Sequence, residues 1–591
     1  MTVGTRTQIK GIAVFVASQV RSLIAVVFAF SLFATACGGG GTSASSNSDT
    51  SSSATTSPDS GTTDDARVDE SADGSDAVTA ADEAVEVAQG GTLRIGLQNE
   101  ASSLNPTNTG INRGPTIIAT GVFDTLVVVD SEGQWQDNLT NGWVPSEDFT
   151  SWDVTVREGV TFSDGEVMNA DAVVANLEAF LADPLTSLAF KPAFAATNAV
   201  EKVDEMTFRL NASGPNTALP FYFTEQLGMI GSPAWLAARD DNPELDQIPI
   251  GAGPYKIVER VQDQITVLER NELYWGEPGI LDRIELFPVV QDSTRTDQFL
   301  GGDLDVTHGT DAESILRLRD EGDEIQRIED NSGEEFMLLM NAQVAPFDDI
   351  RVREAATAAF PKAQYDDFIN EGTAHEADTL FSSETPWHDP SIEQVDDAPE
   401  LAGPLIESYC ADVPEQCTDG RVDIEFQHDG PSAVLTRVQQ LTTDAWSPFF
   451  NATIDVIPND QLIQQVVLGQ YDVSTWRYHG FSDPDVDTAF LSCSTIGAFS
   501  INWSRNCNEE RDALMQQQRM TTDQAERREI WSQIQTNLRD SFQYIVANHT
   551  NWTVAAGENV GGICDAVAPN GEELPCQVRG VVRLPQLFLT N

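Results

Sequence analysis

The sequence contains few basic residues and very few lysines. Against 93 aspartates and glutamates it has 33 lysines and arginines, of which five are lysines, and its formal net charge is −60 at pH 7. An electrostatic field of this sign repels nucleic acid, which excludes nucleic acid as a partner. The acidity either keeps the protein soluble in a salty exterior or steers a cationic solute, and we favour the solubility interpretation.

The sequence also lacks the motifs of common catalytic sites. It has no GxSxG nucleophile elbow and no phosphate-binding loop, and HEADT (residues 375–379) lacks the second histidine of a zinc-protease helix. The six histidines are scattered without the spacing of metal ligands: His308, His375, His388, His428, His479 and His549. We therefore expect no catalytic residue, no cofactor and no metal site, and we keep an exported hydrolase as an alternative.

Cysteines are few, and six of the seven fall in close pairs. The chain has no CxxC spacing, which argues against the alternative of a metal cluster. Disulfides form in exported proteins, and three local pairs are the simplest of the fifteen possible connectivities. The predicted disulfides are Cys410 with Cys417, Cys493 with Cys507, and Cys564 with Cys576.

The seventh cysteine, Cys37, stands where an apolar run ends. Basic residues precede an apolar segment at 23–33 that is short for a membrane span, and small residues at 34–36 follow it. This pattern resembles a bacterial lipoprotein signal at 1–36, which implies lipid on Cys37 and attachment to a membrane. A plain membrane anchor and a signal cut without lipid are the alternatives.

Residues 37–88 contain mainly Gly, Ser, Thr, Ala and Asp, with scarcely a large apolar side chain. Such a composition cannot bury enough surface to offset the entropy of ordering, so we predict a disordered tether. No later window of eighteen residues is apolar enough to be a second membrane segment. The protein is therefore expected to be exported and tethered at the cell surface or in the periplasm.

The remaining five hundred or so residues alternate strand and helix signals. GGTLRIGLQ (residues 90–98) and WDVTV (152–156) have the period of strands, and Asp164-Gly165 predicts a hairpin turn. NADAVVANLEAFL (169–181) has helical period and begins with a polar cap. The predicted class is α/β, mixed with α+β, in two or three lobes.

Four separated stretches together resemble one family. They are WDVTVREGVTFSDGEVMNADAVVANLEAF (152–180), GAGPYKIVERVQDQITVLERNELYWG (251–276), LMNAQVAPFDDIRVREAATAAF (339–360) and WRYHGFSDPD (476–485). In this order and spacing they resemble the family 5 extracellular solute-binding proteins, which deliver dipeptides and oligopeptides to ABC importers. The third stretch departs from the family where FPKAQYD replaces the usual I-D-R. Its charged residues Asp348, Asp349, Arg351 and Arg353 are typical of helix caps and salt bridges.

The resemblance implies a two-lobed fold like that of periplasmic binding proteins, with an extra subdomain in the first lobe and ligand in the cleft between the lobes. The expected division is lobe I at 90–130, 246–335 and 556–591, the extra subdomain at 131–245, and lobe II at 336–555. The implied function is capture of a peptide or peptide-like solute for ABC permease subunits in the membrane, by a monomer without enzymatic activity.

The resemblance also suggests ligand-binding residues. In peptide-binding relatives an aspartate three residues before the acid-Pro step pairs with the peptide's amino terminus, and here that position is Gly480. The candidates in this loop and in the turn after the first strand are Glu100, Ser103, Trp476, Arg477, Tyr478, Gly480, Phe481 and Asp483. Trp476 is either cleft wall or core, and a turn cap is favoured for Asp483 over a ligand anchor.

Gly480 to Asp485 looks more like relatives that take glutathione-like or other small solutes. On the same fold, a metal complex, heme or a sugar is therefore an alternative ligand, with His479 the sole hint of metal. A surface sensor or adhesin that has lost its transporter is a further alternative.

Overall fold

The computed structural model describes residues 89–590, apart from residues 112, 240, 478 and 479. These residues fall in one of the two units into which internal contacts divide the chain, Glu83–Asn591. The predicted signal and tether, Cys37, Tyr478 and His479 lie outside the described residues.

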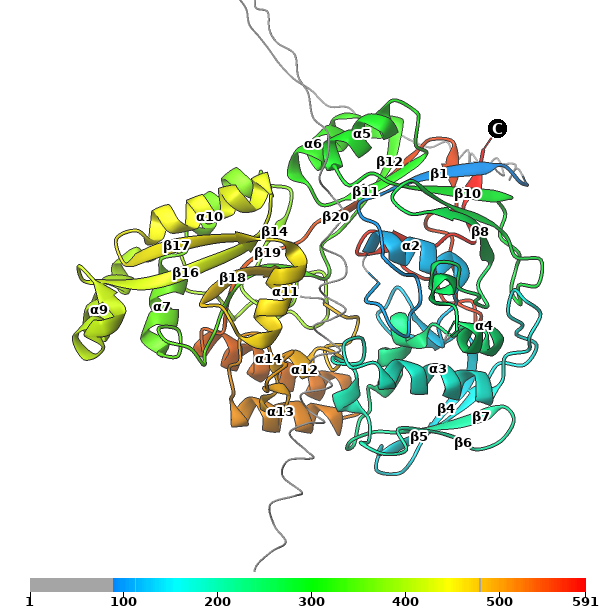
Figure 1. Ribbon diagram of the computed structural model, residues 1–591, viewed down its shortest axis with the longest axis horizontal. Coiled ribbons are helices and arrows are strands. Elements are labelled where there is room, and N and C mark those ends of the chain that lie inside the picture. Colours follow the sequence, from blue (N-terminus) through cyan, green and yellow to red (C-terminus); the bar gives the residue numbers. More distant parts are fainter. Residues whose placement is uncertain (1–88, 112, 240, 478–479, 591) are drawn as a thin grey trace, which may run out of the picture. The chain divides into compact units, whose positions relative to one another are not determined.

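The first large sheet has seven strands in the order β12-β20-β11-β1-β10-β9-β8 (Figure 1). Strand β1 is the predicted first strand, and it lies between two parallel partners, β10 and β11. The other neighbours pair antiparallel. The strands are β1 (Thr92–Leu97), β8 (Tyr255–Val261), β9 (Ile265–Arg270), β10 (Arg283–Pro288), β11 (Val306–Gly309), β12 (Ile325–Asp330) and β20 (Trp552–Gly557).

The second large sheet also has seven strands, in the order β14-β19-β13-β18-β16-β15, with β17 beside β16. On its central strand β13, Phe336 and Leu338 belong to one hydrophobic core, and Met337 and Leu339 belong to another. Because both faces are covered, β13 is continuously apolar from Phe336 to Met340. The strands are β13 (Glu335–Met340), β14 (His375–Glu376), β15 (Cys417–Thr418), β16 (Arg421–Asp429), β17 (Phe450–Ile457), β18 (Val473–Arg477) and β19 (Tyr544–His549).

A four-stranded sheet, in the order β4-β5-β7-β6, has its own core. On β5 the alternate residues Trp152, Val154 and Val156 are buried, as the sequence pattern predicts. The predicted helix follows, and the Asn169 side chain caps it by accepting the Ala172 N–H at 3.0 Å. The strands are β4 (Thr140–Pro145), β5 (Ser151–Val156), β6 (Val200–Lys202) and β7 (Thr207–Asn211).

The short ladders pair β2 with β3, β21 with β24 and β22 with β23. Their bounds are β2 (Val127–Val129), β3 (Trp135–Asp137), β21 (Val560–Gly561), β22 (Gln577–Val578), β23 (Val581–Val582) and β24 (Phe588–Leu589). We call the first sheet together with the four-stranded sheet the first lobe, and the second sheet with its helices the second lobe. The mixed α/β class and the two-lobed fold are as predicted.

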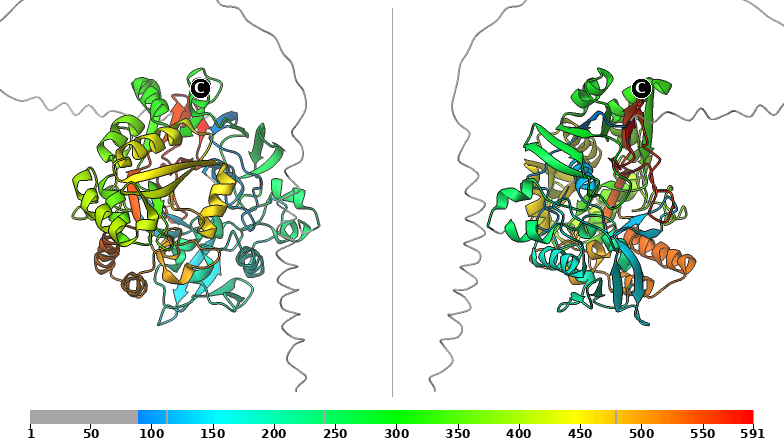
Figure 2. Two further views of the ribbon diagram at one scale, coloured as in Figure 1. Left: turned by 60° about the vertical axis from the view of Figure 1, so that its left-hand side comes forward. Right: turned by 90° about the vertical axis from the view of Figure 1, so that its right-hand side faces the viewer.

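Helices cover both lobes, and the orange pair α13 and α14 packs together on the second (Figure 2). In the first lobe they are α2 (Arg113–Val122), α3 (Ala170–Ala182), α4 (Pro233–Ala238), α5 (Asp292–Leu300) and α6 (Ala312–Asp320). In the second lobe they are α7 (Ile350–Ala358), α8 (Lys362–Tyr365), α9 (Pro399–Asp412), α10 (Ala433–Trp446), α11 (Asn459–Leu468), α12 (Thr488–Leu491), α13 (Glu509–Arg519) and α14 (Gln524–Asp540). Among the described residues, none of the helices combines the length and apolarity needed to cross a bilayer.

The hairpin formed by β8 and β9 begins against the end of α2. The Gly253 N–H donates to the Val122 carbonyl oxygen at 2.8 Å. A Cβ atom at Gly253 would lie 2.5 Å from the Val122 carbonyl carbon, so a larger residue would push the helix away. Close backbone approach, rather than a turn conformation, therefore explains this glycine of the GAGPY segment.

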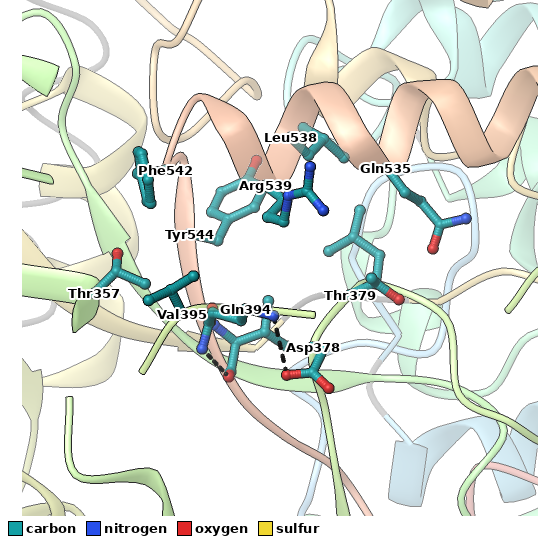
Figure 3. A pocket seen from close by; sticks show the side chains of 12 residues that line it. Thr357, Asp378, Thr379, Gln394, Val395, Gln535, Leu538, Arg539, Phe542 and Tyr544 are labelled. Carbon is teal, nitrogen blue, oxygen red and sulfur yellow. Dashed lines mark hydrogen bonds between the residues drawn. The ribbon is translucent and has the colours of Figure 1, made fainter. Parts of the chain in front are cut away.

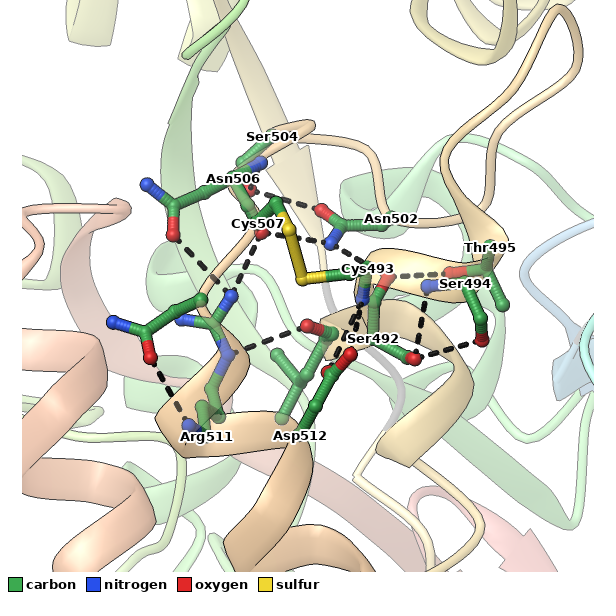
Figure 4. Close-up of a disulfide and its surroundings, with 12 residues drawn as sticks. Ser492, Cys493, Ser494, Thr495, Asn502, Ser504, Asn506, Cys507, Arg511 and Asp512 are labelled. Atoms are coloured by element: carbon green, nitrogen blue, oxygen red, sulfur yellow. Dashed lines mark hydrogen bonds between the residues drawn. A yellow bond between two sulfur atoms is a disulfide. The ribbon is translucent and has the colours of Figure 1, made fainter.

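Three disulfides join the predicted local pairs, Cys410–Cys417, Cys493–Cys507 and Cys564–Cys576. Figure 4 shows the second of these, beside which the Cys493 N–H donates to Asp512 Oδ1 at 3.1 Å. The loop that this disulfide closes contains Ile501 and Trp503, which line the large cavity described below. The disulfide thereby restrains part of the cavity wall.

Candidate functional site

A cavity of about 1230 Å³ is lined by residues of both lobes. This volume exceeds the several hundred cubic ångströms of most small-molecule sites. The first lobe contributes residues of α2, the segments 185–190 and 224–226, and the C-terminal segment 578–585. The second lobe contributes residues of α10, α11 and β18 with the loops that follow. The chain passes between the two sheets at residues 331–334 and at 550–551, and these crossings lie side by side, since the Thr550 N–H donates to the Glu334 carbonyl at 2.9 Å.

Aromatic side chains form much of the cavity wall. Trp503 packs against Trp476, with ring centroids 4.9 Å apart, and against Phe490, at 4.6 Å. Phe190 of the first lobe meets Phe481 of the second edge to face at 6.1 Å. Walls of this kind bind apolar and planar groups and bring little conformational entropy cost.

Arg579, in the C-terminal segment, connects the lobes beside the cavity. Its guanidinium donates to the carboxylate of Glu225 and to the carbonyl oxygen of Gly480, and it lies 5.7 Å from the Phe481 ring centroid. The backbone N–H of Arg579 donates to Asp330 Oδ2 at 2.7 Å. A side chain that bonds both lobes at once stabilises the closed arrangement of the cavity.

Two further arginines of the cavity wall lie near carboxylates without close contact. Arg113 Nη1 is 3.8 Å from Glu225, and Arg477 Nη1 is 3.9 Å from Glu334. Burial, together with the neighbouring Arg579, lowers the pKa of Arg113 to about 10. The Arg113 guanidinium stays charged at neutral pH, and neither arginine is held by a short hydrogen bond in the described part of the chain.

Two buried carboxyl groups lie behind the wall. Burial raises the pKa of Glu335 and of Asp487 well above the usual values, and their mutual repulsion adds to the shift for Glu335. Asp487 Oδ2 accepts the Phe481 N–H at 3.4 Å, so it supports the loop that carries this ring. These groups position the cavity wall rather than line it.

Three of the residues predicted from the sequence line the cavity: Trp476, Arg477 and Phe481. Trp476 contacts the second lobe's core and is half-buried, so it is at once wall and core edge. Their contact with a solute stays a prediction.

The other described candidates bond elsewhere. Glu100 Oε1 accepts from the buried Arg260 at 2.8 Å, and Ser103 Oγ accepts the Asn105 N–H at 3.1 Å. The Gly480 carbonyl bonds Arg579, and the Asp483 carboxylate is 1% exposed and paired with Arg527. None of these four is among the described residues that line the cavity.

Sequence reasoning missed several wall residues, namely Arg113, Arg437, Trp503, Trp552, Arg579 and Arg583. They are isolated in the sequence, and only long-range packing assembles them. Gln98 and Asn99 come closest to a sequence signal, because they directly precede the predicted turn at 100–105 and line the cavity. Asn99 Oδ1 accepts the Gly114 N–H at 3.0 Å, which fixes the start of α2.

A second cavity lies within the second lobe, between α14 and the segments around Asp378 and Gln394 (Figure 3). The Gln394 N–H donates to Asp378 Oδ1 at 3.2 Å on its wall. Its volume is about 30 Å³. A space of that size holds about one water molecule and is too small for a solute.

His308 contacts two residues of the cavity wall, Gln98 and Trp552. Its Nε2 accepts the Gln98 N–H at 3.2 Å, and its ring stacks on Trp552 with centroids 6.1 Å apart. Burial, with Arg295 nearby, lowers the pKa of His308 to about 3. The neutral ring therefore carries the native contacts.

Acid should destabilise the protein through His308. Because the pKa of His308 is lower in the folded protein than in the unfolded chain, its neutral ring contributes fully to stability above about pH 6.5. This contribution is lost as the pH falls toward 3. The variant His308→Gln does not titrate and keeps an acceptor near Nε2. Relative to this variant, the free energy of unfolding of the wild-type protein should fall by about 1.4 kcal/mol per pH unit below pH 6.5. Urea unfolding of both proteins at pH 7.5, 5.5 and 4.5 measures this difference, and a constant difference contradicts the prediction.

Comparison with known proteins gives one consistent picture. Residues 134–498 match the model for bacterial extracellular solute-binding proteins, family 5, middle. A nickel-binding periplasmic protein of Escherichia coli K12 is 24% identical over 483 residues, which cover 77% of this chain and 88% of the relative. The glutathione-binding protein GsiB of the same strain is 27% identical over 244 residues, 41% of this chain and 47% of the relative.

A solved structure shows the same fold. The ABC transporter-associated periplasmic binding protein DppA from Helicobacter pylori, in complex with peptide STSA, superimposes with a TM-score of 0.72 at 18% identity. The match covers 85% of this chain and 99% of that protein.

Proposed function

Because the chain belongs to the family 5 bacterial extracellular solute-binding proteins, we propose that it is the receptor of an ABC importer for a peptide or peptide-like solute. The observation that carries the proposal is the large cavity lined by both lobes and spanned by Arg579. Hinge motion at the two crossings, 331–334 and 550–551, would open and close it. The closed form would present both lobes to the permease.

The proposal assigns no catalytic role to this chain. Trp476, Arg477, Tyr478 and Phe481 would contact the solute from the second lobe, and Gly480 and Asp483 would hold that loop. The turn at Glu100 and Ser103 would support Gln98 and Asn99 on the other side. The protein would act as a monomer.

We also propose that lipid on Cys37 tethers the receptor to a membrane, through the segment 37–88. Radiolabelled palmitate should enter the wild-type protein in bacteria and should not enter the variant Cys37→Ser. Labelling of that variant would overturn the proposed anchor.

The test of the receptor function is identification of the natural solute. Small molecules released on denaturing the purified full chain are identified by mass spectrometry, and each is then titrated against the protein in thermal unfolding. A peptide or peptide-like compound should be released, and at a hundred times its Kd it should stabilise the fold by about 2.7 kcal/mol. Stabilisation by nickel complexes or sugars alone would overturn the peptide assignment and leave a solute receptor.

A further inference from the structure

Nearly every arginine in the described part of the chain has a hydrogen bond or an ion pair. The exceptions are Arg437, Arg528 and Arg583. In a chain with 93 acidic and 33 basic residues, an arginine with neither a hydrogen bond nor an ion pair is the exception among the described residues. Arg528 is exposed on α14, away from the cavity, whereas Arg437 and Arg583 line the cavity.

Arg583 is the more enclosed of the two. It directly follows β23, is half-buried, and lines the same cavity as Thr120 of α2 and Phe123 and Asp124, which follow that helix. The helix end is close, since a Cβ atom at Gly121 would lie 2.9 Å from Leu584 Cδ1. Burial lowers the pKa of Arg583, because enclosure in the protein removes water from around its charge.

The nearby carboxylate does not replace this lost water. Asp124 lies beyond ion-pair distance of the Arg583 guanidinium, and its Oδ2 already accepts the Trp275 indole N–H at 2.8 Å. A guanidinium has five N–H donors in a planar fork that fits a carboxylate with two parallel bonds. The arrangement leaves Arg583 a charged donor group on the cavity wall without an acceptor among the described residues.

The other arginines of the first-lobe wall are less available. Arg579 is engaged by Glu225 and Gly480, and Arg113 shares Glu225 at 3.8 Å. On this side of the cavity, Arg583 is therefore the arginine that makes neither a hydrogen bond nor an ion pair with the described residues.

We propose that Arg583 binds a carboxylate of the solute, so that the receptor selects anionic peptides or peptide-like acids. This inference rests on the proposed solute-receptor function and names the chemistry of its ligand. The same fork would fit a phosphate, and the aromatic walls beside a peptide-sized volume favour the carboxylate.

Equilibrium dialysis with a casein hydrolysate tests the proposal. The full chain, purified in mild detergent, is dialysed against untreated hydrolysate and against the same hydrolysate with its carboxylates converted to methyl esters. Mass spectrometry identifies the retained peptides, and tryptophan fluorescence measures their affinity, because Trp476, Trp503 and Trp552 line the cavity. Wild-type protein should bind the methyl esters at least about tenfold more weakly.

The variant Arg583→Gln should bind the retained peptides about 10- to 100-fold more weakly, and Arg583→Lys should recover part of the loss. The matched control is Arg528→Gln, which removes another unpaired arginine outside the cavity and should bind as wild type does. Circular dichroism verifies that each variant is folded, so that weaker binding reports the site.

The possible failures are distinguishable. Equal binding of acids and methyl esters, or unchanged affinity in Arg583→Gln, would overturn the role of Arg583 and leave the receptor function intact. Retention of phosphorylated compounds alone, displaced by inorganic phosphate, would overturn the choice of a carboxylate. If wild-type protein retains nothing from either preparation, the proposed function fails and this inference fails with it.

Discussion

Asp483→Asn is expected to lower the free energy of unfolding by about 3–5 kcal/mol, the usual cost of breaking a buried ion pair from one side. Asp483 accepts both Arg527 Nη1 and Nη2 at 2.6 Å in a bidentate pair. The side chains are 1% and 2% exposed, so neither charge can recover its loss from water. Urea unfolding followed by far-ultraviolet circular dichroism measures the change.

The size of the effect follows from what Arg527 would retain. Its Nε donates to Gln518 at 2.9 Å, and its guanidinium lies 5.1 Å from the Trp387 ring centroid. Neither contact carries a negative charge, so the buried cation would keep only the more distant charge of Asp485, which already accepts from Arg519. Glu529→Gln on α14 is the control, because it removes an exposed carboxylate and should cost less than about 0.5 kcal/mol. A loss below about 1 kcal/mol in Asp483→Asn would contradict the prediction.

Asp483 also shows what the sequence could and could not reveal. Its Oδ1 accepts the Asp485 N–H at 2.8 Å, which is the turn cap that the Asp-Pro step favours. The partner Arg527 is 44 residues away on a helix, and no local pattern identifies it. The sequence therefore indicates the turn correctly and leaves the ion pair unseen.

The parts of the fold that were predicted share a local cause. The strand at 152–156 alternates because one face packs on a core, and the helix after Asn169 begins where a polar side chain caps it. The disulfide pairs are close in sequence, which makes local closure the simplest choice. Periodicity, capping and spacing are visible in any short window.

The cavity depends on contacts that no short window contains. Arg579 and Arg583 lie in the C-terminal segment, which is anchored when Gln577 Nε2 donates to the Ile328 carbonyl at 2.7 Å. Arg579 then meets Glu225, 354 residues earlier, and Gly480, 99 residues earlier. One of these arginines lies in the turn of a short β-ladder and the other directly after it, and no sequence pattern distinguishes them from surface charges.

Asp485, two residues after Asp483, bonds residues of both lobes. Asn216 Nδ2 donates to its Oδ2 at 2.8 Å and the Tyr222 hydroxyl donates at 3.0 Å, both from the first lobe. Arg519 of the second lobe donates to Oδ1 at 2.7 Å. Burial raises the pKa of Asp485, but Arg519 and Arg527 outweigh it and hold the pKa below its usual value. The charged form therefore connects the lobes at neutral pH.

Asp485→Asn should release this connection without unfolding either lobe. Both carboxylate oxygens of Asp485 accept hydrogen bonds, so the NH2 group of an asparagine would face one of the donors. Arg519 would also lose its counterion. The reporter is the Thr217 amide, which donates to the Arg519 carbonyl at 2.9 Å across the same contact. Its protection from hydrogen exchange should fall about 100- to 1000-fold, equivalent to about 3–4 kcal/mol.

Two comparisons make this second prediction specific. Tyr222→Phe removes one donor and keeps the ring, so Thr217 should lose only about tenfold protection. The amides of β5 and β7 belong to the first lobe alone, and their exchange should stay as in wild type in both variants. If these amides lost protection together with Thr217, Asp485 would stabilise the fold as a whole. The buried carboxylate would then not act specifically as the contact that holds the two lobes together.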